Sequence, residues 1–523
     1  MNAASRLSSR RGLLRAAGLA GAALAAKPLR AAAGPAPVTY RRLPRWRGFN
    51  LPDKIYVSHN KPFQESDFDL IAEWGFDFVR LPLDYQNWTP QPDRFSETDL
   101  REIDQAVAWG QARGIHVDLC LHRAPGFSVV GRIDALNLWG EGPDGDEARR
   151  QFEAQWRMLA ERYRGIPSTC LSFNLVNEPP TMSGDLYRRC VGPAIAAVHE
   201  SDPDRLVIAD GVSGNSFCML PVPELIPLGV AQSLHAYFPK RVTHFRAGWE
   251  ADDDHTSAPA WPAPNPMNGY LFGAGKRQWN TPLVISGAFR RESEMQIEVE
   301  LVSAFDHLVV EADGSVIFDQ ILKADRTGEG NWKRSRHFGP EGAGWYHAIY
   351  DRPFVATVPA GTRQLTIGVR DGDWMTFSAL RFRPSPIDGA DQFEIVPGLM
   401  EYGRAQQVFS LDPNGQLRPL SGPPTYGREN LWQDEIEPWA RFADSQIGVH
   451  VGEFGCNNKT PHDVALAWTK DNLEEFRRAG FGWALWNLRG GYGILDSQRR
   501  DVTYEDYRGH KLDRRMLEVL RSG

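Results

Sequence analysis

Two glutamates of this chain lie beside apolar segments that end abruptly. In SFNLVNEPPT, residues 172–181, Asn177 and Glu178 follow an apolar run and precede two prolines, which have no N–H group to donate within a central β-strand. A second glutamate, Glu453, lies near the end of the apolar segment VHVGEFG. Each carboxylate alone is most simply interpreted as a solvated side chain, because charged residues lie mostly at the surface. Their meaning therefore depends on the elements that position them.

Composition restricts the class of protein. The chain has 523 residues, a net charge of −7 and 42% hydrophobic residues, enough for a large core and more than one domain. It has no long basic run, which argues against a nucleic acid partner, since phosphate binding requires clustered Lys and Arg. The 17 tryptophans can fill cores or stack on sugar rings. The five cysteines lack CxxC spacing and the acidic stretches DGDW and DDDH lack calcium-loop spacing, so we expect no metal and no cofactor.

Residues 1–33 predict an export signal. Arg10 and Arg11 precede a weakly apolar stretch of Ala, Gly and Leu, and the small residues AAA end at Ala33, which is the order found in twin-arginine signal peptides. The signal predicts a periplasmic or extracellular location. No segment reaches the roughly 20 apolar residues that a membrane-spanning helix needs, so we expect no membrane span. The sequence leaves the oligomeric state open.

Strand-like and helix-like segments alternate along the rest of the chain. Segments such as DLREIDQAVAWGQARG and VALAWTKDNLEEFRRAG carry apolar residues at the three- and four-residue spacing of helices. Eight repeats of strand then helix predict an α/β protein with a closed (β/α)8 TIM barrel, whose active site is built at the carboxyl ends of its strands. The eight strand segments are RGFNL, FDFVRLPL, HVDLCLH, LSFNLVNEP, RLVIADG, VAQSLHAYF, VHVGEFG and GWALWNL.

The segment between the sixth and seventh strands is too long for a single helix. Within it, MQIEVELVSAFDHLVVEADGSVIFDQIL and FVATVPAGTRQLTIGVRD show the alternating pattern and Asp-Gly turns of an antiparallel β-sandwich. We predict barrel segments at residues 40–285 and 401–523, interrupted by an inserted antiparallel β-sandwich domain at residues 286–400.

Two interpretations of the insert remain open. It is either a carbohydrate-binding module or a rigid structural element. Trp332, Trp345 and Trp374 could supply stacking surfaces for a sugar, but the sequence does not show whether these rings are exposed.

Polar residues without an obvious structural reason lie near the ends of six of the eight predicted strands. Each has an ordinary alternative, since an arginine can form a structural ion pair, a histidine can be a satisfied core residue and a tryptophan can pack. In a barrel, however, the carboxyl ends of all strands meet at one face, so we expect these residues to gather there. They are Arg80, His122, Asn177, Glu178, His235, Tyr237, Glu453 and Trp486.

Glu178 and Glu453, on the fourth and seventh strands, would face each other across one cleft. Cleavage of a glycosidic bond requires two such carboxyl groups: one donates a proton to the departing oxygen, and the other stays ionised to attack the anomeric carbon or stabilise its charge. A separation of about 5 to 5.5 Å gives retention of configuration through a covalent intermediate, whereas about 6.5 to 9.5 Å gives inversion. The sequence does not give that distance.

The motifs resemble those of glycoside hydrolase family 5, the cellulase-like family of clan A. NLVNEP is similar to its acid/base signature and VGEFG to its nucleophile strand, while FVRLPL, LHRAPG, LHAYFP and WALWNL follow in the family's order. Each string alone is weak, but six in sequence are highly specific. The resemblance covers roughly residues 40–285 and 425–523 and leaves out the β-insert.

The resemblance implies a retaining mechanism with Glu178 as general acid/base and Glu453 as nucleophile. An arginine beside a carboxylate lowers its pKa and a second carboxylate raises it, which agrees with separate roles for the two glutamates. The other roles implied at matching positions are a hydrogen bond from Asn177 to the sugar 2-hydroxyl, support of Glu453 by Arg80 and Tyr237, a reacting-sugar subsite lined by His122 and His235, and a stacking floor from Trp486.

These observations predict an exported retaining β-glycoside hydrolase whose partner is a β-linked glucan or related chain. One alternative is a family 5 enzyme that acts on mannan, xyloglucan or short β-glucosides, since the loops that discriminate these substrates are the least predictable part. Another is a non-catalytic carbohydrate-binding protein, although a binder has no need for a matched carboxylate pair. Whether cleavage is endo or exo is left open.

Overall fold

The computed structural model describes residues 37–131, 133–213, 218–248, 258–325, 332, 334–338, 344–387 and 391–523. The predicted export signal at residues 1–33 lies outside the described residues. The described chain forms a parallel β-barrel and an antiparallel β-region, and both belong to the unit Val38–Gly523.

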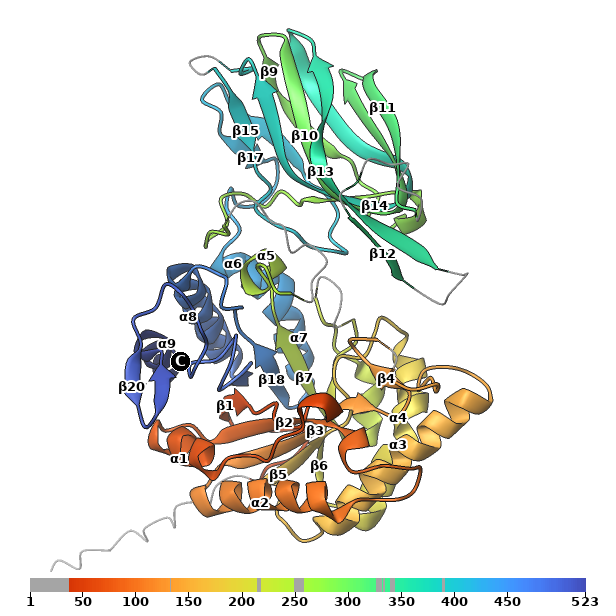
Figure 1. Cartoon of the computed structure of the whole chain (residues 1–523), viewed down its shortest axis with the longest axis vertical. Helices are drawn as coiled ribbons and strands as arrows, with labels where there is room; N and C mark the ends of the chain where they lie inside the picture. Colours follow the sequence, from red (N-terminus) through yellow and green to blue (C-terminus); the bar gives the residue numbers. More distant parts are fainter. Residues whose placement is uncertain are drawn as a thin grey trace, which may run out of the picture. The chain divides into compact units, whose positions relative to one another are not determined.

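Eight parallel strands close into a barrel, which confirms the predicted (β/α)8 fold. The strand order is β2-β1-β19-β18-β7-β6-β5-β3, and β2 pairs with β3 to close the ring. Helices surround the strands on the outside (Figure 1). The strands are buried almost throughout, since side chains also fill the inside of such a barrel. Their bounds are β1 (Arg47–Asn50), β2 (Phe78–Asp84), β3 (His116–Ala124), β5 (Leu171–Asn174), β6 (Leu206–Asp210), β7 (Ala231–Ala236), β18 (Val449–Phe454) and β19 (Gly482–Leu485), with the short β4 (Phe127–Ser128) antiparallel to β3.

The helices begin and end at residues with clear backbone signals. Helices α2 and α8 end at Gly114 and Gly480, whose φ values of 67° and 77° suit glycine, and α3 begins at Pro143. No described helix has both the length and the apolar composition to cross a bilayer. The bounds are α1 (Glu65–Glu73), α2 (Glu97–Arg113), α3 (Pro143–Arg162), α4 (Gly184–Ser201), α5 (Lys240–Thr243), α6 (Arg428–Leu431), α7 (Glu437–Ala443), α8 (His462–Ala479) and α9 (Arg514–Ser522), with a π-helix η5 (Trp432–Ile436), 3₁₀ turns η1 (Val57–His59), η2 (Tyr85–Asn87), η3 (Pro223–Leu228) and η4 (Ala274–Lys276), and a hairpin of β20 (Glu505–Tyr507) and β21 (His510–Leu512).

The β-region consists of long strands around a hydrophobic core of its own. Its hairpin between β10 and β11 turns at Asp313 and Gly314, both with positive φ, as an Asp-Gly two-residue turn requires. The strands extend beyond residues 286–400 on both sides, from Tyr270 to Pro419, and the domain boundaries stay a prediction. They are β8 (Tyr270–Phe272), β9 (Leu283–Phe289), β10 (Ser293–Ala312), β11 (Ser315–Lys323), β12 (Arg334–Phe338), β13 (Trp345–Val358), β14 (Thr362–Arg383), β15 (Phe393–Ile395), β16 (Val408–Leu411) and β17 (Leu417–Pro419).

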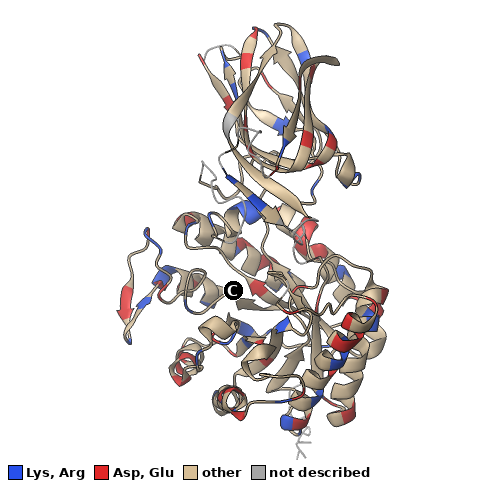
Figure 2. Cartoon of the chain, turned by 45° about the vertical axis from the view of Figure 1, so that its right-hand side comes forward, with Lys and Arg blue, Asp and Glu red and all other residues tan. Residues whose placement is uncertain are grey.

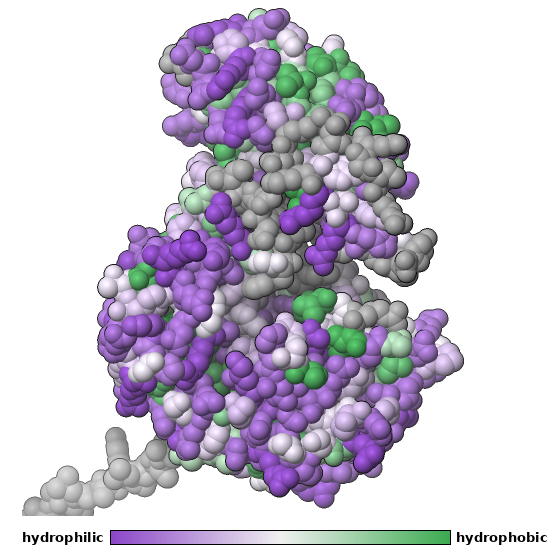
Figure 3. All heavy atoms as spheres, viewed as in Figure 1, coloured by the Kyte–Doolittle hydropathy of each residue, from purple (hydrophilic) through white to green (hydrophobic). Residues whose placement is uncertain are grey.

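The three tryptophans of the β-region differ in exposure. Trp374 is only 8% exposed and packs in a cluster of aromatic side chains, and Trp332 packs against the core of the β-region. Trp345 is 48% exposed. The surface of this region also carries exposed apolar side chains such as Ile321, and green patches mark hydrophobic residues there in Figure 3. Of the three rings, Trp345 offers the most surface to a sugar.

Charged residues of both signs are interspersed over the chain. In Figure 2, Lys and Arg lie beside Asp and Glu along the outer helices of the barrel. Many form surface ion pairs, such as Arg157 with Glu153 and Glu200. Exposed pairs of this kind contribute little to stability, typically about 0 to 1 kcal/mol each.

Candidate active site

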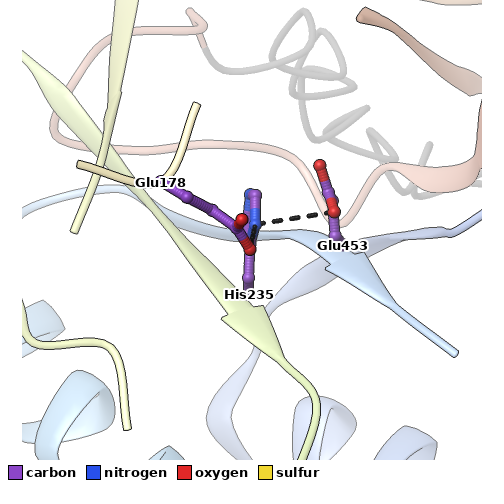
Figure 4. Close-up of side chains that lie close together, drawn as sticks. All are labelled: Glu178, His235 and Glu453. Carbon is purple, nitrogen blue, oxygen red and sulfur yellow. Dashed lines mark hydrogen bonds and ion pairs between the residues drawn. The ribbon is translucent and has the colours of Figure 1, made fainter. Parts of the chain in front are cut away.

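Four neighbouring barrel strands bring their carboxyl ends, and four ionisable side chains, to one place. In the order β5, β6, β7 and β18, these side chains are Glu178, Asp210, His235 and Glu453. His235 and Glu453 are direct neighbours in the register of β7 and β18. The barrel thus joins residues that are up to 275 positions apart in the sequence, as Figure 4 shows for three of them.

The two glutamates approach each other with His235 between them. His235 Nδ1 lies 2.9 Å from Glu178 Oε1 and 3.6 Å from Glu453 Oε2 (Figure 4). One carboxylate oxygen of each glutamate and one ring nitrogen of His235 all lie within 4.8 Å of one another. This spacing is close to that of the carboxyl pairs of retaining glycosidases and shorter than the gap of about 6.5 to 9.5 Å that inverting enzymes need for a water molecule.

Glu453 accepts a hydrogen bond at each oxygen. Arg80 Nη1 lies 2.6 Å from Oε1, and the hydroxyl of Tyr237 donates to Oε2 at 3.0 Å. Burial raises the pKa of the Glu453 carboxyl above its ordinary value, the charges of His235 and Arg80 lower it, and Glu178 raises it. The expected effect of Arg80 is therefore present, but burial outweighs it. Two donors directed at its two oxygens favour the ionised form.

Arg80 differs from its expected position. The sequence placed it at a strand end, whereas it is the third residue of β2, which continues to Asp84. Its guanidinium, 1% exposed, reaches Glu453 from inside the barrel. The remaining N–H groups are directed at Asn50 Oδ1 (3.1 Å), Asn174 Oδ1 (2.9 Å), Asn177 Oδ1 (2.9 Å), Asp210 Oδ2 (3.5 Å) and Cys120 Sγ (3.0 Å).

Glu178 lies beyond its strand in a strained backbone conformation. Strand β5 ends at Asn174, and Glu178 has a φ of 47°, in the left-handed region that non-glycine residues rarely adopt. Such a conformation costs on the order of 1–3 kcal/mol and persists only where the surroundings impose it. Here the N–H group of Glu178 donates to Asp210 Oδ2 at 3.1 Å, and Asn177 Nδ2 lies 3.4 Å from Glu178 Oε2.

Asp210 and Asn174 are site residues that sequence reasoning missed. Asp210 is fully buried at the end of β6, and Asn174 Nδ2 donates to its Oδ1 at 2.9 Å. Although burial opposes it, the charges of His235 and Arg80 hold the pKa of Asp210 below its ordinary value. The acid at the end of RLVIADG was a usable signal, because it ends a barrel strand just as the other site residues do.

The two histidines have opposite ionisation. Burial lowers the pKa of His235, but Glu453 and Asp210 outweigh it and raise that pKa to about 10. His235 is therefore a cation at neutral pH. Burial and the charge of Arg80 hold the pKa of His122 well below its ordinary value, so this ring is neutral. Its Nδ1 has no hydrogen-bond partner among the described residues, and its ring stacks on Trp486 with ring centroids 5.7 Å apart.

The backbone that carries Tyr237 is held by two buried carboxyl groups. Tyr237 N donates at 3.1 Å to Oε1 of Glu435, which lies on the π-helix η5. Lys240 N donates to Glu401 Oε1 at 2.7 Å. Burial raises the pKa of Glu401 to about 8 and that of Glu435 well above its ordinary value. The segment after β7 is thus anchored by two buried carboxyl groups whose pKa values are raised.

Glu401→Gln is expected to flatten the pH dependence of stability. Between pH 4.5, where Glu401 ionises in the unfolded chain, and about 8, the folded chain holds a proton that the unfolded chain has lost. The free energy of unfolding therefore falls as pH rises through this window, by at most about 1.4 kcal/mol per pH unit for one group. Urea unfolding at pH 5, 6 and 7 should show that the free energy of unfolding falls less steeply with pH in the variant than in the wild type. Glu394→Gln, at an exposed position on β15, should leave the slope unchanged, and parallel curves for Glu401→Gln would contradict this assignment.

A metal ion at this site would have to displace groups that are already bound. Among the described residues, Glu178, His235 and Glu453 are close enough to share an ion. However, His235 is protonated and Glu453 is bonded to Arg80 and Tyr237, so a cation would compete with a proton and a guanidinium. The donor set fits a proton-transfer and charge network better than a metal centre.

A (β/α)8 barrel with two facing carboxyl groups at the carboxyl ends of its strands defines the class of glycosidase-like barrels. Residues 35–266 match the family described as Cellulase (glycosyl hydrolase family 5). This matched region, somewhat less than half of the chain, is thus similar to glycosyl hydrolase family 5. The match ends before Glu453 and Trp486, which lie in the second barrel segment.

Parts of this chain are similar in sequence to known proteins. It is 32% identical to a probable glucan 1,3-beta-glucosidase A of Emericella nidulans over 158 residues, 28% of this chain and 37% of that protein. It is 28% identical to endoglucanase C of Acetivibrio thermocellus over 188 residues, 35% of this chain and 53% of that protein. The alignments therefore span about a third to a half of these relatives.

A solved structure supports the fold over nearly the whole chain. A crystal structure of a glycoside hydrolase covers 91% of this chain and 99% of its own, with a TM-score of 0.56 and 24% sequence identity. At that identity the likeness concerns the fold.

Proposed function

We propose that this protein is a retaining β-glycoside hydrolase that cleaves a β-linked glucan or a related chain. The observation that carries the proposal is the approach of Glu178 and Glu453 from neighbouring parts of one barrel face, with His235 within hydrogen-bond distance of Glu178. Two carboxyl groups at this spacing suit double displacement, in which one acts as nucleophile and the other as acid and then base.

We assign the nucleophile to Glu453 and the acid/base role to Glu178. Glu453 accepts bonds from Arg80 and Tyr237, which orient its carboxylate for attack on the anomeric carbon. Three carboxyl groups, including Asp210, face two cations, Arg80 and His235, so a single proton makes the cluster neutral. Glu178 has the most exposed of the three carboxyl side chains, at 14%, which suits the group that donates this proton to the leaving oxygen.

The reaction then follows in two balanced steps. Glu453 forms a bond to the anomeric carbon as the glycosidic C–O bond breaks, and the proton of Glu178 passes to the departing oxygen. Glu178, now ionised, takes a proton from water, whose oxygen displaces Glu453. We propose that Asn177 binds the sugar 2-hydroxyl, that His122 and His235 line the subsite, and that Trp486 forms its stacking floor.

The substrate class and location are further parts of the proposal. Relatives named as glucan 1,3-beta-glucosidase and endoglucanase support a β-glucan, with mannan, xyloglucan or short β-glucosides as the alternative. We propose export by the twin-arginine route to the periplasm or exterior, based on Arg10, Arg11 and the small residues that follow. We also keep the boundaries 1–33, 40–285, 286–400 and 401–523 as proposed domains.

A glycan screen with product stereochemistry tests this function. The purified protein is incubated with β-1,3-glucan, β-1,4-glucan, mannan, xyloglucan and short oligosaccharides, and the first-formed anomer is followed by NMR. We expect the β-anomer from at least one substrate. A first-formed α-anomer would contradict the retaining mechanism, and binding without turnover of any glycan would favour a carbohydrate-binding protein. Products from a long polymer also distinguish endo from exo cleavage.

Glu178→Gln is expected to separate the acid role from attack. Hydrolysis of natural glycans should fall by about 10²- to 10⁴-fold, the usual contribution of a general acid. Release of dinitrophenolate from an activated aryl glycoside in a single turnover should change far less, because this leaving group needs no proton. Glu200→Gln, with a carboxyl that is 70% exposed, is the control and should behave as wild type. Equal losses on both substrates would contradict the acid role of Glu178.

A further inference from the structure

Asp210 lies fully buried among the ionisable side chains of the site. Its carboxylate is fully buried at the end of β6. Oδ1 accepts from Asn174 Nδ2 at 2.9 Å, while Oδ2 lies 3.1 Å from the N–H nitrogen of Glu178, 3.2 Å from His235 Nε2 and 3.5 Å from Arg80 Nη2. One oxygen therefore contacts the backbone of one glutamate and the ring that faces both glutamates.

The first of these contacts holds the strained backbone of Glu178. The residue has a φ of 47°, and its N–H group donates to Asp210 Oδ2. A second backbone bond, from Ser213 N to Pro179 O at 3.0 Å, fixes the following residue to the loop after β6. Without the carboxylate acceptor, a buried N–H group would be unpaired and the left-handed conformation would lose its support.

The second contact sets the charge of His235. His235 Nε2 lies 3.2 Å from Asp210 Oδ2, an ion-pair contact without hydrogen-bond geometry, while Nδ1 lies 2.9 Å from Glu178 Oε1 and 3.6 Å from Glu453 Oε2. A carboxylate on one ring nitrogen favours the doubly protonated ring. The cationic ring then lies between the proton donor and the nucleophile.

We propose that Asp210 is a positioning residue that holds the main chain of Glu178 in place and keeps His235 doubly protonated between Glu178 and Glu453. The role of these glutamates rests on the proposed function. The arrangement of Asp210 and His235 does not depend on the proposed function, because it is a property of the folded chain alone.

The surrounding charges are compatible with this role. His235 also faces His122 on β3 and His450 on β18, both of which burial keeps neutral by lowering their pKa values. Asp210 also faces Asp118 on β3, whose pKa burial raises to about 7, and Tyr187 on α4, whose hydroxyl donates to the backbone oxygen of Asp210. Within the part of the chain that the structure describes, Asp210, Glu178 and Glu453 are thus the carboxyl groups in ion-pair contact with the His235 ring.

Ring NMR of His235 tests the proposal without any substrate. The 13 histidines are labelled with ¹⁵N, and His235 is assigned by its loss in His235→Gln. In the wild type, we expect both ring nitrogens to stay protonated above pH 8. Titration of His235 near its ordinary pKa of about 6.5 would overturn the proposal, whether or not any variant folds.

Asp210→Asn and Asp118→Asn form a matched pair of buried substitutions. Asp118 is buried on β3 and accepts from Ser172, but no contact joins its carboxyl to Glu178 or His235 within the described residues. We expect the ring of His235 to titrate at least one pH unit lower in Asp210→Asn and to be unchanged in Asp118→Asn. An unchanged ring in both variants, or an equal shift in both, would overturn the proposal.

Kinetics then separate positioning from general destabilisation. In Asp210→Asn, we expect kcat to fall about 10-fold or more on glycosides with poor leaving groups, with little change in KM. The rate of single-turnover release of dinitrophenolate should fall by less than about 3-fold, because a misplaced acid mainly affects leaving groups that must be protonated. Uniform losses on all leaving groups would contradict positioning of Glu178. If the wild type hydrolyses no glycoside, the proposed function fails while the NMR result still decides the role of Asp210.

Discussion

Glu453→Gly is expected to lower the rate of glycan hydrolysis by about 10⁴-fold or more, the scale on which loss of a nucleophile is felt in enzymes. An oxygen of Glu453 lies within 4.8 Å of a side-chain oxygen of Glu178 and a ring nitrogen of His235, and Arg80 and Tyr237 orient the carboxylate. Without its carboxylate, the group that we propose to form the covalent intermediate is missing. Initial rates on the best glycan of the screen measure the loss.

Added azide should restore turnover of an activated aryl β-glycoside by Glu453→Gly. The anion fits the space left by the carboxylate, forms a C–N bond to the anomeric carbon from that face, and displaces the aryloxide to give an α-glycosyl azide. Glu178→Gly is the matched control, because azide then attacks the intermediate on Glu453 and gives the β-azide. A β-azide from Glu453→Gly and an α-azide from Glu178→Gly would mean that the two glutamates have the reverse roles. Circular dichroism of both variants shows whether they fold.

Arg80→Met is expected to lower the free energy of unfolding by about 3–5 kcal/mol, because removing one partner of a buried ion pair leaves the other charge uncompensated. Arg80 is 1% exposed and bonds Glu453 at 2.6 Å, with further contacts to Asp210 and three asparagines. Methionine fills a similar volume but donates no hydrogen bond. Urea denaturation at pH 7 measures the change.

Arg157→Met is the control for this loss. Arg157 pairs with Glu153 and Glu200 at the surface, with a side chain that is 38% exposed. Such pairs contribute about 0 to 1 kcal/mol, so the two variants should differ by several kcal/mol. A loss below about 1 kcal/mol for Arg80→Met would show that the buried network is not held together by its guanidinium.

The barrel could be predicted because its signal is local and repeated. All eight apolar segments form the expected strands, and helices such as α2 and α8 follow their apolar spacing and are capped by Gly114 and Gly480. The end of a strand is less certain in a sequence. The apolar run after Arg80 extends β2 to Asp84, and the run before Glu178 ends at Asn174, so one site residue lies within its strand and the other beyond it.

Which polar residues meet could be predicted only in part. Glu178, Glu453, Arg80, His235 and Tyr237 lie together as expected, because parallel strands share one end of the barrel. Asp210 was missed, since an acid followed by glycine at the end of RLVIADG is also typical of a turn. The protonation of His235 could not be predicted either, because it depends on three carboxyl groups from three other strands or their ends.

The sequence by itself determined the alternation of strands and helices, the antiparallel character of the segment inserted between β7 and α7, and the residue types near the strand ends. These follow from hydrophobic periodicity and turn residues, which act over a few neighbouring positions. Only the tertiary structure decided the spacing of the two glutamates, the depth of Arg80 and the charge of His235. Distances and ionisation depend on how closed strands bring remote charges into a common region of low dielectric, and no local stretch of sequence contains that information.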